Sequence, residues 1–228
     1  MADRLARIKL LLGDENVKKL QNATVMVVGC GAVGSFAIEA LARSGVGHLV
    51  VVDFDKIEES NINRQLFALT STVGTPKVSV AAARVRDINP DAVVDTFDMF
   101  FDDAHAPDVA PDFVIDAIDS VPSKIALAVW CQARNIPFIS SMGAARKTDP
   151  TQIKITRLSK TTVCPLAAKI RRLIRAAHIP DYPVVYSTEA ANPNVAPNHT
   201  FGSMITITGT FGLMCANYVI RHIVDMHE

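Results

Sequence analysis

The stretch "VVGCGAVGS", Val27 to Ser35, joins an apolar run to a helical pattern through three glycines with the spacing GxGxxG. The residues before the glycines, Thr24–Val28, are apolar and mostly β-branched, which predicts a buried strand. The residues from Ser35 to Gly45 have helical periodicity and stop at a glycine. A strand, a glycine turn and a helix in this order predict the first unit of an α/β fold.

Each of the three glycines has its own physical role. Gly29 permits a tight turn, Gly31 lets the backbone approach a phosphate, and Gly34 allows the helix to pack closely. The N-terminus of that helix then faces the anion. Asp53 ends the next apolar run, His48–Asp53, about 20 residues further on, where a carboxylate accepts a hydrogen bond from a ribose hydroxyl. The pattern predicts a nucleotide site, and the alternative is a glycine turn that binds nothing.

The remaining patterns extend the α/β fold. Further strands are predicted at residues 92–97, 112–119 and 137–143, and helices at residues 77–88 and 123–135. Because strands alternate with helices, we expect a Rossmann-like, mostly parallel sheet with helices on both faces. Later patterns predict a half-exposed strand, an amphipathic helix and a loop, at residues 152–158, 166–177 and 181–199. We expect one domain, in which residues 1–148 bind the nucleotide and residues 149–228 bind the substrate and add partly antiparallel strands.

The charges of the chain balance overall but not locally. The 228 residues are 49% hydrophobic with no formal net charge, which suits one buried core and argues against nucleic-acid binding over the whole surface. Residues 87–119 hold ten aspartates and no lysine or arginine, whereas residues 151–180 hold seven lysines or arginines and no acid. This separation predicts a basic face beside an acidic one, which suits a polyanion held at one edge.

The four cysteines are widely spaced and form no CxxC pair. They are Cys30, Cys131, Cys164 and Cys215. This spacing argues against a zinc site and against a disulfide framework.

Phe201–Ile220 is twenty residues long without a charge, a length that just spans a bilayer. Its hydroxyl residues, its glycines and Asn217 favour instead a buried strand and helix in the core or in a subunit interface. The N-terminal segment carries scattered charges, which is not typical of a secretory signal. We therefore expect a cytoplasmic protein that does not enter a membrane.

Three charged side chains follow predicted strands, at the edge of the sheet where ligands of such folds bind. Arg64 lies in "SNINRQLF", Lys77 follows "VGTP", and Asp119 ends "DAID". Two cations suit the attack of a carboxylate on a phosphate, because the charge of two anions must be neutralised. An aspartate there suits Mg²⁺. The ordinary alternatives are a salt bridge of Arg64 with Glu58 or Glu59, a solvated Lys77, and a helix cap at Asp119.

Six motifs occur in order between Leu11 and Gly143: "VVGCGAVGS", "VVVDFD", "SNINRQLF", "VGTPKV", "INP" and "DAIDS". In this combination the chain resembles the ubiquitin-activating-enzyme superfamily, which includes the adenylyltransferases of molybdopterin and thiamine biosynthesis. The resemblance implies adenylation of a carboxylate with ATP and Mg²⁺ on a homodimer.

The resemblance also implies roles for individual residues. Asp53 would hold the ribose, Asp119 would serve the metal, and Arg7 resembles an arginine that reaches the nucleotide of the neighbouring subunit. The residues that would contact or line the nucleotide are Gly29, Gly31, Gly34, Asp53, Asp55, Asn61, Arg64, Lys77, Ser120 and Lys124. Arg64, Lys77 and Asp119 are the expected catalytic residues. A monovalent cation near the nucleotide is left open.

Two observations narrow the branch of the superfamily. Activators of ubiquitin-like carrier proteins commonly have two CxxC pairs for zinc, which this chain lacks. Residues 149–161, 165–171, 186–189 and 208–212 instead resemble the tRNA threonylcarbamoyladenosine dehydratase family. Members of that family adenylate the carboxylate of threonylcarbamoyladenosine beside the anticodon and close it into a ring, with net loss of water. A tRNA substrate is therefore expected, and a sulfur-relay protein partner is left open.

A tRNA substrate would give the basic segment a role, because lysine and arginine bind phosphates independently of base sequence. The seven candidates are Lys154, Arg157, Lys160, Lys169, Arg171, Arg172 and Arg175. The alternative is a solvated helix face. Cys164 is left open as a covalent nucleophile, because neighbouring cations would lower the pKa of its thiol. His199 is a candidate acid or base in "VAPNH", where the family often has a cysteine.

Three other functions stay open on the sequence. One is an adenylyltransferase that activates the C-terminal glycine of a ubiquitin-like sulfur-carrier protein. Another is a nicotinamide-dependent oxidoreductase, which uses the same glycine fingerprint. The last is a scaffold that keeps the pocket without catalysis. The cations expected beside the phosphates favour adenylation over hydride transfer, which does not need them.

Overall fold

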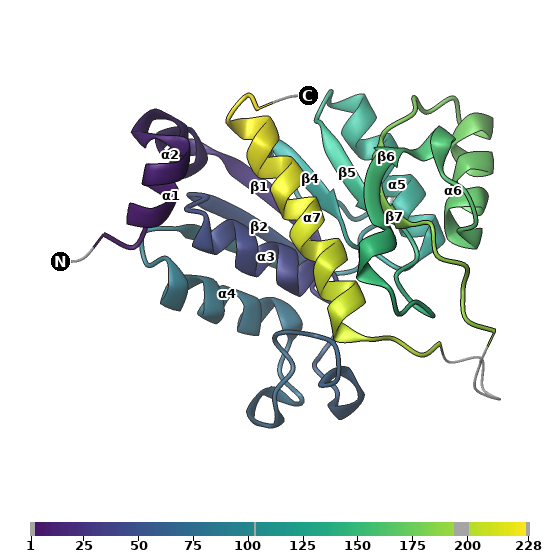
Figure 1. The fold of residues 1–228 in the computed structure, drawn as a ribbon. Coiled ribbons are helices and arrows are strands. Elements are labelled where there is room, and N and C mark those ends of the chain that lie inside the picture. Colours follow the sequence, from purple (N-terminus) through teal and green to yellow (C-terminus); the bar gives the residue numbers. More distant parts are fainter. Residues whose placement is uncertain (1–2, 103, 194–200, 227–228) are drawn as a thin grey trace.

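The computed structural model of the chain describes residues 3–102, 104–193 and 201–226. These residues form a seven-stranded sheet with the strand order β3-β2-β1-β4-β5-β7-β6 (Figure 1). The strands are β1 (Thr24–Val28), β2 (His48–Asp53), β3 (Val93–Asp98), β4 (Phe113–Asp116), β5 (Phe138–Ser141), β6 (Ile153–Arg157) and β7 (Pro183–Ser187). Neighbouring strands pair in parallel, except that β6 is antiparallel to β7. The predicted fold class is confirmed, and the boundary at residue 148 stays a prediction.

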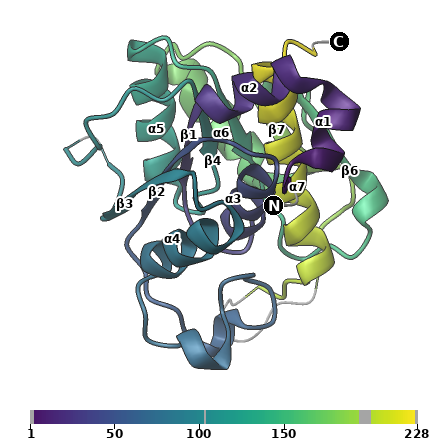
Figure 2. The same cartoon turned by 90° about the vertical axis from the view of Figure 1, so that its left-hand side faces the viewer.

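Helices cover both faces of the sheet (Figures 1 and 2). They are α1 (Ala6–Leu12), α2 (Asp14–Asn22), α3 (Gly34–Arg43), α4 (Lys77–Ile88), α5 (Val121–Ala133), α6 (Pro165–Ala176) and α7 (Ile205–Ile223). Helices α3, α4 and α7 pack on one face, and α5 and α6 on the other. The strand order reverses between β1 and β4, and folds of this kind bind ligands at the carboxyl ends of the strands beside such a reversal.

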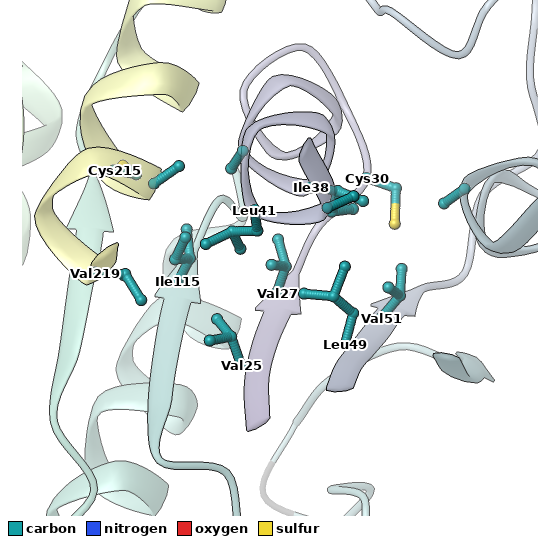
Figure 3. Close-up of a cluster of buried hydrophobic side chains, with 14 of the residues drawn as sticks. Val25, Val27, Cys30, Ile38, Leu41, Leu49, Val51, Ile115, Cys215 and Val219 are labelled. Carbon is teal, nitrogen blue, oxygen red and sulfur yellow. The ribbon is translucent and has the colours of Figure 1, made fainter. Parts of the chain in front are cut away.

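The central strands are buried on both sides. Val27 and Val51 belong to the cluster under α3, α4 and α7 (Figure 3), whereas their neighbours Val28 and Val52 pack with residues of α5. Burial of a side chain of this size stabilises the fold by about 1.5–3 kcal/mol. Because helices cover both faces, the strands are continuous apolar runs rather than alternating ones, which is the pattern that made them predictable.

Helix α7 crosses α3 at close range. A Cβ on Gly212 would lie 2.2 Å from the carbonyl oxygen of Val33, and one on Gly209 would lie 3.2 Å from the Phe36 ring. The uncharged segment Phe201–Ile220 therefore belongs mostly to a core helix that uses glycines at a crossing, and the strand expected within it is wrong. Within the described ranges, no helix is both long and apolar enough to cross a membrane.

Two other predicted segments differ from the structure. Strand β7 lies inside residues 181–199, which were predicted as a loop, because prolines and asparagines surround a short apolar run. Its Val184 and Val185 are fully buried. Strand β4 ends at Asp116 rather than at Asp119. The chain turns there, and the backbone N–H of Ile118 donates to the Asp116 carboxylate at 3.1 Å.

Candidate nucleotide site

The glycine loop leaves space for a ligand at one of its three glycines and none at the other two. Gly29 has φ +98°, and a Cβ there would lie 2.7 Å from the carbonyl oxygen of Ala117. A Cβ on Gly34 would lie 1.7 Å from the carbonyl oxygen of Gly29. A Cβ on Gly31 would meet nothing nearer than Gln65 Nε2 at 3.9 Å. Gly29 and Gly34 are thus required for packing, and Gly31 faces open space that a phosphate can enter.

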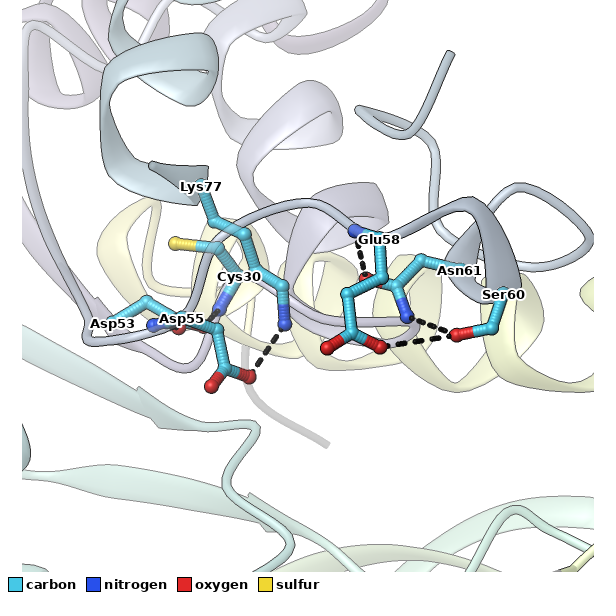
Figure 4. A network of polar contacts seen from close by, with 7 residues as sticks. All are labelled: Cys30, Asp53, Asp55, Glu58, Ser60, Asn61 and Lys77. Carbon is cyan, nitrogen blue, oxygen red and sulfur yellow. Dashed lines mark hydrogen bonds and ion pairs between the residues drawn. The ribbon is translucent and has the colours of Figure 1, made fainter. Parts of the chain in front are cut away.

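Asp53 is tied to the glycine loop by its carboxylate (Figure 4). One carboxylate oxygen accepts from the backbone N–H of Cys30 at 2.6 Å, and the other accepts from that of Asp55 at 2.8 Å. Burial raises the pKa of Asp53, opposed by these two hydrogen bonds and by the charge of Lys77. Each carboxylate oxygen has a second lone pair, so Asp53 can also accept from ribose hydroxyls.

Lys77 begins α4, and its ammonium group is held at the same edge (Figure 4). Nζ lies 2.7 Å from a carboxylate oxygen of Asp55, and the Lys77 side chain is 7% exposed. Asp55 is 47% exposed at its side chain, so only one member of the pair faces solvent. The alternative of a solvated Lys77 is therefore wrong. A buried cation beside one exposed carboxylate is placed to exchange that partner for an entering phosphate.

The loop that contains Arg64 is held by its own side chains. Asn61 Oδ1 accepts from the backbone N–H of Glu58 at 3.2 Å (Figure 4). Arg64 donates from Nη1 to the carbonyl oxygen of Ser60 and to Oδ1 of Asn63, each at 2.9 Å. No Arg64 ion pair with a glutamate is formed among the described residues, so that alternative is not realised. A guanidinium has five N–H donors, and both of these bonds leave from one nitrogen.

The residues at the start of α5 differ in what they offer a ligand. Ser120, not Asp119, is the N-cap of α5, so the alternative of a cap at Asp119 is wrong. Asp119 is exposed. Lys124 is 1% exposed, and its ammonium group donates to three protein oxygens: a carboxylate oxygen of Asp116 at 2.9 Å, Ser140 Oγ at 3.2 Å and Ser141 O at 2.8 Å. A role of Lys124 beside the nucleotide stays a prediction; its observed contacts are internal.

The described residues contain no cluster of three or more His, Cys, Asp or Glu side chains that could hold a metal ion. Mg²⁺ is commonly bound by one or two carboxylates together with substrate phosphates, rather than by a protein cage. The exposed Asp119 at the carboxyl edge fits that mode of binding, and Mg²⁺ stays a prediction.

Arg7 lies on α1, far from the glycine loop of its own chain. Leu5, just before α1, approaches Gly45, which follows the C-terminal end of α3. The glycine loop precedes the N-terminal end of α3, and a helix of 10 residues is about 15 Å long. Arg7 is exposed. A contact with the nucleotide of the neighbouring subunit stays a prediction.

The cysteines do not provide an exposed nucleophile. All four are buried, and Cys164 packs in a hydrophobic cluster with 4% exposure. Burial raises the pKa of Cys30 and Cys131 well above the usual range, and that of Cys215 to about 12. A reactive thiol is exposed with a lowered pKa, so the geometry does not support a covalent step at Cys164. His199 lies outside the described residues.

The seven cations of the basic segment differ in exposure and in internal bonding. All except Arg171 are exposed: Lys154, Arg157, Lys160, Lys169, Arg172 and Arg175. Arg157 also contacts Asp181, and Arg171 donates to the carbonyl oxygen of Thr161 at 2.8 Å. Because of these internal bonds, we expect Arg157 and Arg171 to contribute less to an interaction with phosphates than the other five.

Three side chains of this edge were missed by the sequence analysis. Gln65 is 8% exposed and is the nearest side chain to the open space at Gly31. The motif "SNINRQLF" contains it, and the only available signal was a polar residue next to the arginine. Phe54 follows Asp53 and is 55% exposed; its ring packs edge-on against Phe100 with centroids 5.1 Å apart. This pair forms an apolar surface beside the carboxylate that is suited to a base.

Comparison with known proteins identifies the family of the chain. The model of the ThiF family matches residues 2–228. The chain is 46% identical to the tRNA threonylcarbamoyladenosine dehydratase of Bacillus subtilis, over 83% of this chain and 76% of that protein. The chain belongs to the ThiF family, in its tRNA threonylcarbamoyladenosine dehydratase branch.

Solved structures of this branch of the ThiF family match nearly the whole chain. The Escherichia coli tRNA N6-threonylcarbamoyladenosine dehydratase in complex with AMP superposes with a TM-score of 0.92 at 36% identity, covering 98% of this chain and 94% of that chain. The same enzyme in complex with ATP gives a TM-score of 0.91 at the same identity and coverage. The ATP and AMP of those complexes are bound by a protein of the same fold.

Proposed function

We propose that the chain is an ATP-dependent dehydratase that adenylates the carboxylate of threonylcarbamoyladenosine in tRNA and closes it into a ring. The observation that carries the proposal is the convergence of the open glycine loop, the Asp53 carboxylate and the buried Lys77 ammonium at one edge of the sheet. Membership of the dehydratase branch gives this nucleotide site its substrate.

The residues of the edge account for the proposed adenylation. Asp53 binds the ribose, and the backbone at Gly31 and the N-terminus of α3 receive phosphate oxygens. Arg64 and Lys77 neutralise the charge that develops when the carboxylate attacks the α-phosphorus and pyrophosphate leaves. Asn61, Ser120 and Asp55 would line the nucleotide site. An intramolecular nucleophile of the substrate then displaces AMP, which closes the ring.

Asp119 would hold Mg²⁺ against the phosphates in this proposal. The ion would supply further positive charge at the phosphoryl oxygens. The exposed cations of the basic segment would hold tRNA phosphates, on a cytoplasmic homodimer in which Arg7 reaches the neighbouring nucleotide. Whether a sulfur-relay protein or a monovalent cation binds to the chain stays open.

The direct test is turnover. The protein is incubated with tRNA that carries threonylcarbamoyladenosine, ATP and Mg²⁺, and the nucleosides are examined by mass spectrometry. We expect conversion to a product lighter by one water, and persistence of the starting nucleoside with folded protein would overturn the proposal. Pyrophosphate exchange stimulated only by a peptide that ends in Gly-Gly would point to activation of a carrier protein instead.

The Arg64→Ala variant tests the role of the guanidinium. We expect adenylation to slow by about 10²–10³-fold, because removal of one donor to a developing anion has this effect, while ATP binding weakens far less. The control is Arg86→Ala, an exposed arginine of α4. Equal losses of rate and of ATP affinity would indicate that Arg64 only holds its loop together.

A further inference from the structure

A groove of about 870 Å³ lies between α5 and α6, apart from the nucleotide pocket. The two helices lie side by side on the face of the sheet opposite α7 (Figure 1). The volume is within the range of sites that hold small molecules or single nucleotides, about 300–1,000 Å³. None of the roles assigned above to the adenylation site uses this groove.

The floor of the groove is an apolar stripe. Pro122, Ile125 and Val129 recur along α5 at helical spacing, and Leu173 of α6 faces them. Val129 is 43% exposed, so a large apolar side chain is left without cover. An apolar surface of this kind favours a ligand with a flat or apolar part.

The end of the groove carries a stacked aromatic and cationic pair. The Arg134 guanidinium lies 4.6 Å from the centre of the Trp130 ring. Trp130 is 7% exposed, and its indole Nε1 has no hydrogen-bond partner in the part of the chain that the structure describes. Nε1 itself is buried, so a ligand in the groove meets the Arg134 guanidinium rather than this N–H. Unpaired nucleobases stack on arginine planes.

The charges around the groove favour an anion. Lys169 and Arg134 are both exposed at its rim. Asp102 is the acid among the lining residues, and its carboxylate accepts from the His105 ring at 2.9 Å and from two backbone N–H groups. These bonds lower the pKa of Asp102, the His105 bond most of all, so its carboxylate stays ionised and faces two cations, Arg134 and Lys169. The groove is thus apolar at its floor and cationic at its rim.

One end of the groove lies near the carboxyl edge of the sheet, where the candidate adenylation site lies. Its first lining residues, Val121 and Pro122, directly follow Asp119 and Ser120 at the carboxyl edge. Helix α5 has 13 residues, which corresponds to a length of about 20 Å from that edge to Arg134. A strand that delivers a reacting nucleoside to the edge can therefore continue along the groove.

We propose that the α5–α6 groove binds unpaired nucleotides that neighbour the reacting nucleoside of the tRNA, with a base on the Val129 and Arg134 surface and phosphates at Lys169 and Arg134. This proposal rests on the proposed function for the identity of the substrate, but its binding test does not require turnover.

Trp130 is the single tryptophan of the chain and reports directly on the groove. A short single-stranded oligoribonucleotide of mixed sequence is titrated into the protein while tryptophan fluorescence is followed. We expect saturable quenching that weakens with salt. An unchanged spectrum would overturn the proposal. Quenching by polyglutamate but not by RNA would also overturn it and would assign the groove to an acidic protein partner.

Two pairs of variants separate the groove from general charge effects. Val129→Glu places a carboxylate on the floor and is expected to weaken RNA binding by at least about fivefold, the lower range for loss of one stacked base. Its control is Val93→Glu, the same change at a valine of β3 that is 56% exposed. Lys169→Ala is expected to reduce the salt dependence of RNA affinity by about 0.7 logarithmic units per tenfold change in salt concentration. Its control is Lys18→Ala, at an exposed lysine of α2, which is expected to leave that dependence unchanged.

Turnover of modified tRNA then separates the two proposals. If the groove proposal is correct, Val129→Glu raises KM for tRNA by the same factor by which it weakens RNA binding, and it leaves ATP affinity unchanged. If wild-type protein turns over tRNA and Val129→Glu behaves like Val93→Glu, the groove proposal fails and the proposed function stands. If wild-type protein binds RNA in the groove without turnover, the proposed function fails instead.

Discussion

Replacing Lys124 by methionine should destabilise the fold severely without a direct effect on ATP. The ammonium group and the Asp116 carboxylate lie 2.9 Å apart, with side-chain exposures of 0% and 2%. Methionine leaves the carboxylate buried, with Ser140 Oγ as its remaining side-chain donor. Breaking a buried ion pair by removing one partner costs about 3–5 kcal/mol. In a chain of this size the melting temperature then falls by about 6–20 °C, at roughly 2–4 °C per kcal/mol.

The assay is urea unfolding followed by circular dichroism, with a thermal melt of the same samples. The double variant Asp116→Asn/Lys124→Met removes both charges and should recover most of the loss, because no uncompensated charge stays buried. The control is Lys18→Met, an exposed lysine of α2, which should change stability by less than about 0.5 kcal/mol.

Binding of ATP to the folded fraction of Lys124→Met decides between two roles for the lysine. The internal contacts of its ammonium group predict nearly unchanged affinity. A variant as stable as the wild type that no longer binds ATP would refute this reasoning and would make Lys124 a ligand of the nucleotide.

Three further predictions follow from the packing and the charges. Gly34→Ala should abolish ATP-induced thermal stabilisation and lower the melting temperature, because its Cβ would lie 1.7 Å from a carbonyl oxygen, whereas Gly202→Ala has nothing within 4 Å and should be neutral. Arg84→Ala should cost about 1–2 kcal/mol at neutral pH, because Arg84 bonds both oxygens of Glu39. Burial raises the pKa of Glu39, but the hydrogen bonds outweigh it and the net pKa is lowered. The loss in the free energy of unfolding caused by Arg84→Ala should therefore be present above about pH 4.5 and vanish in urea melts at lower pH. Cys164→Ala should keep turnover within about threefold, since the thiol is buried in an apolar cluster; complete loss in a folded variant would restore a covalent step.

The sequence was sufficient for those features that depend on neighbouring residues in the chain. The strand at Thr24–Val28, the helix at Lys77–Ile88 and the glycine spacing were all predictable, because periodicity and turn chemistry are local. The placement of Lys77 at the carboxyl edge of the sheet also followed, since parallel strands end together. The approach of Arg64 to a nucleotide at that edge stays a prediction. The strand at Pro183–Ser187 was not predictable from the sequence, because no local pattern distinguishes its short apolar run. The strand is stabilised by pairing with strands that are distant in sequence.

Only the tertiary structure shows which charged side chains are bonded inside the protein and which can meet a ligand. In the sequence, Lys124 and Lys77 are both lysines near predicted helix starts; in the fold, three internal oxygens surround the first and an exposed carboxylate meets the second. The tertiary contacts likewise bury Cys164 and place Lys169 beside the α5 stripe. The local pattern along the chain thus determined the fold and the edge of the sheet that carries the candidate nucleotide site. The partner of each charge depends on residues distant in sequence, and only their packing could decide it.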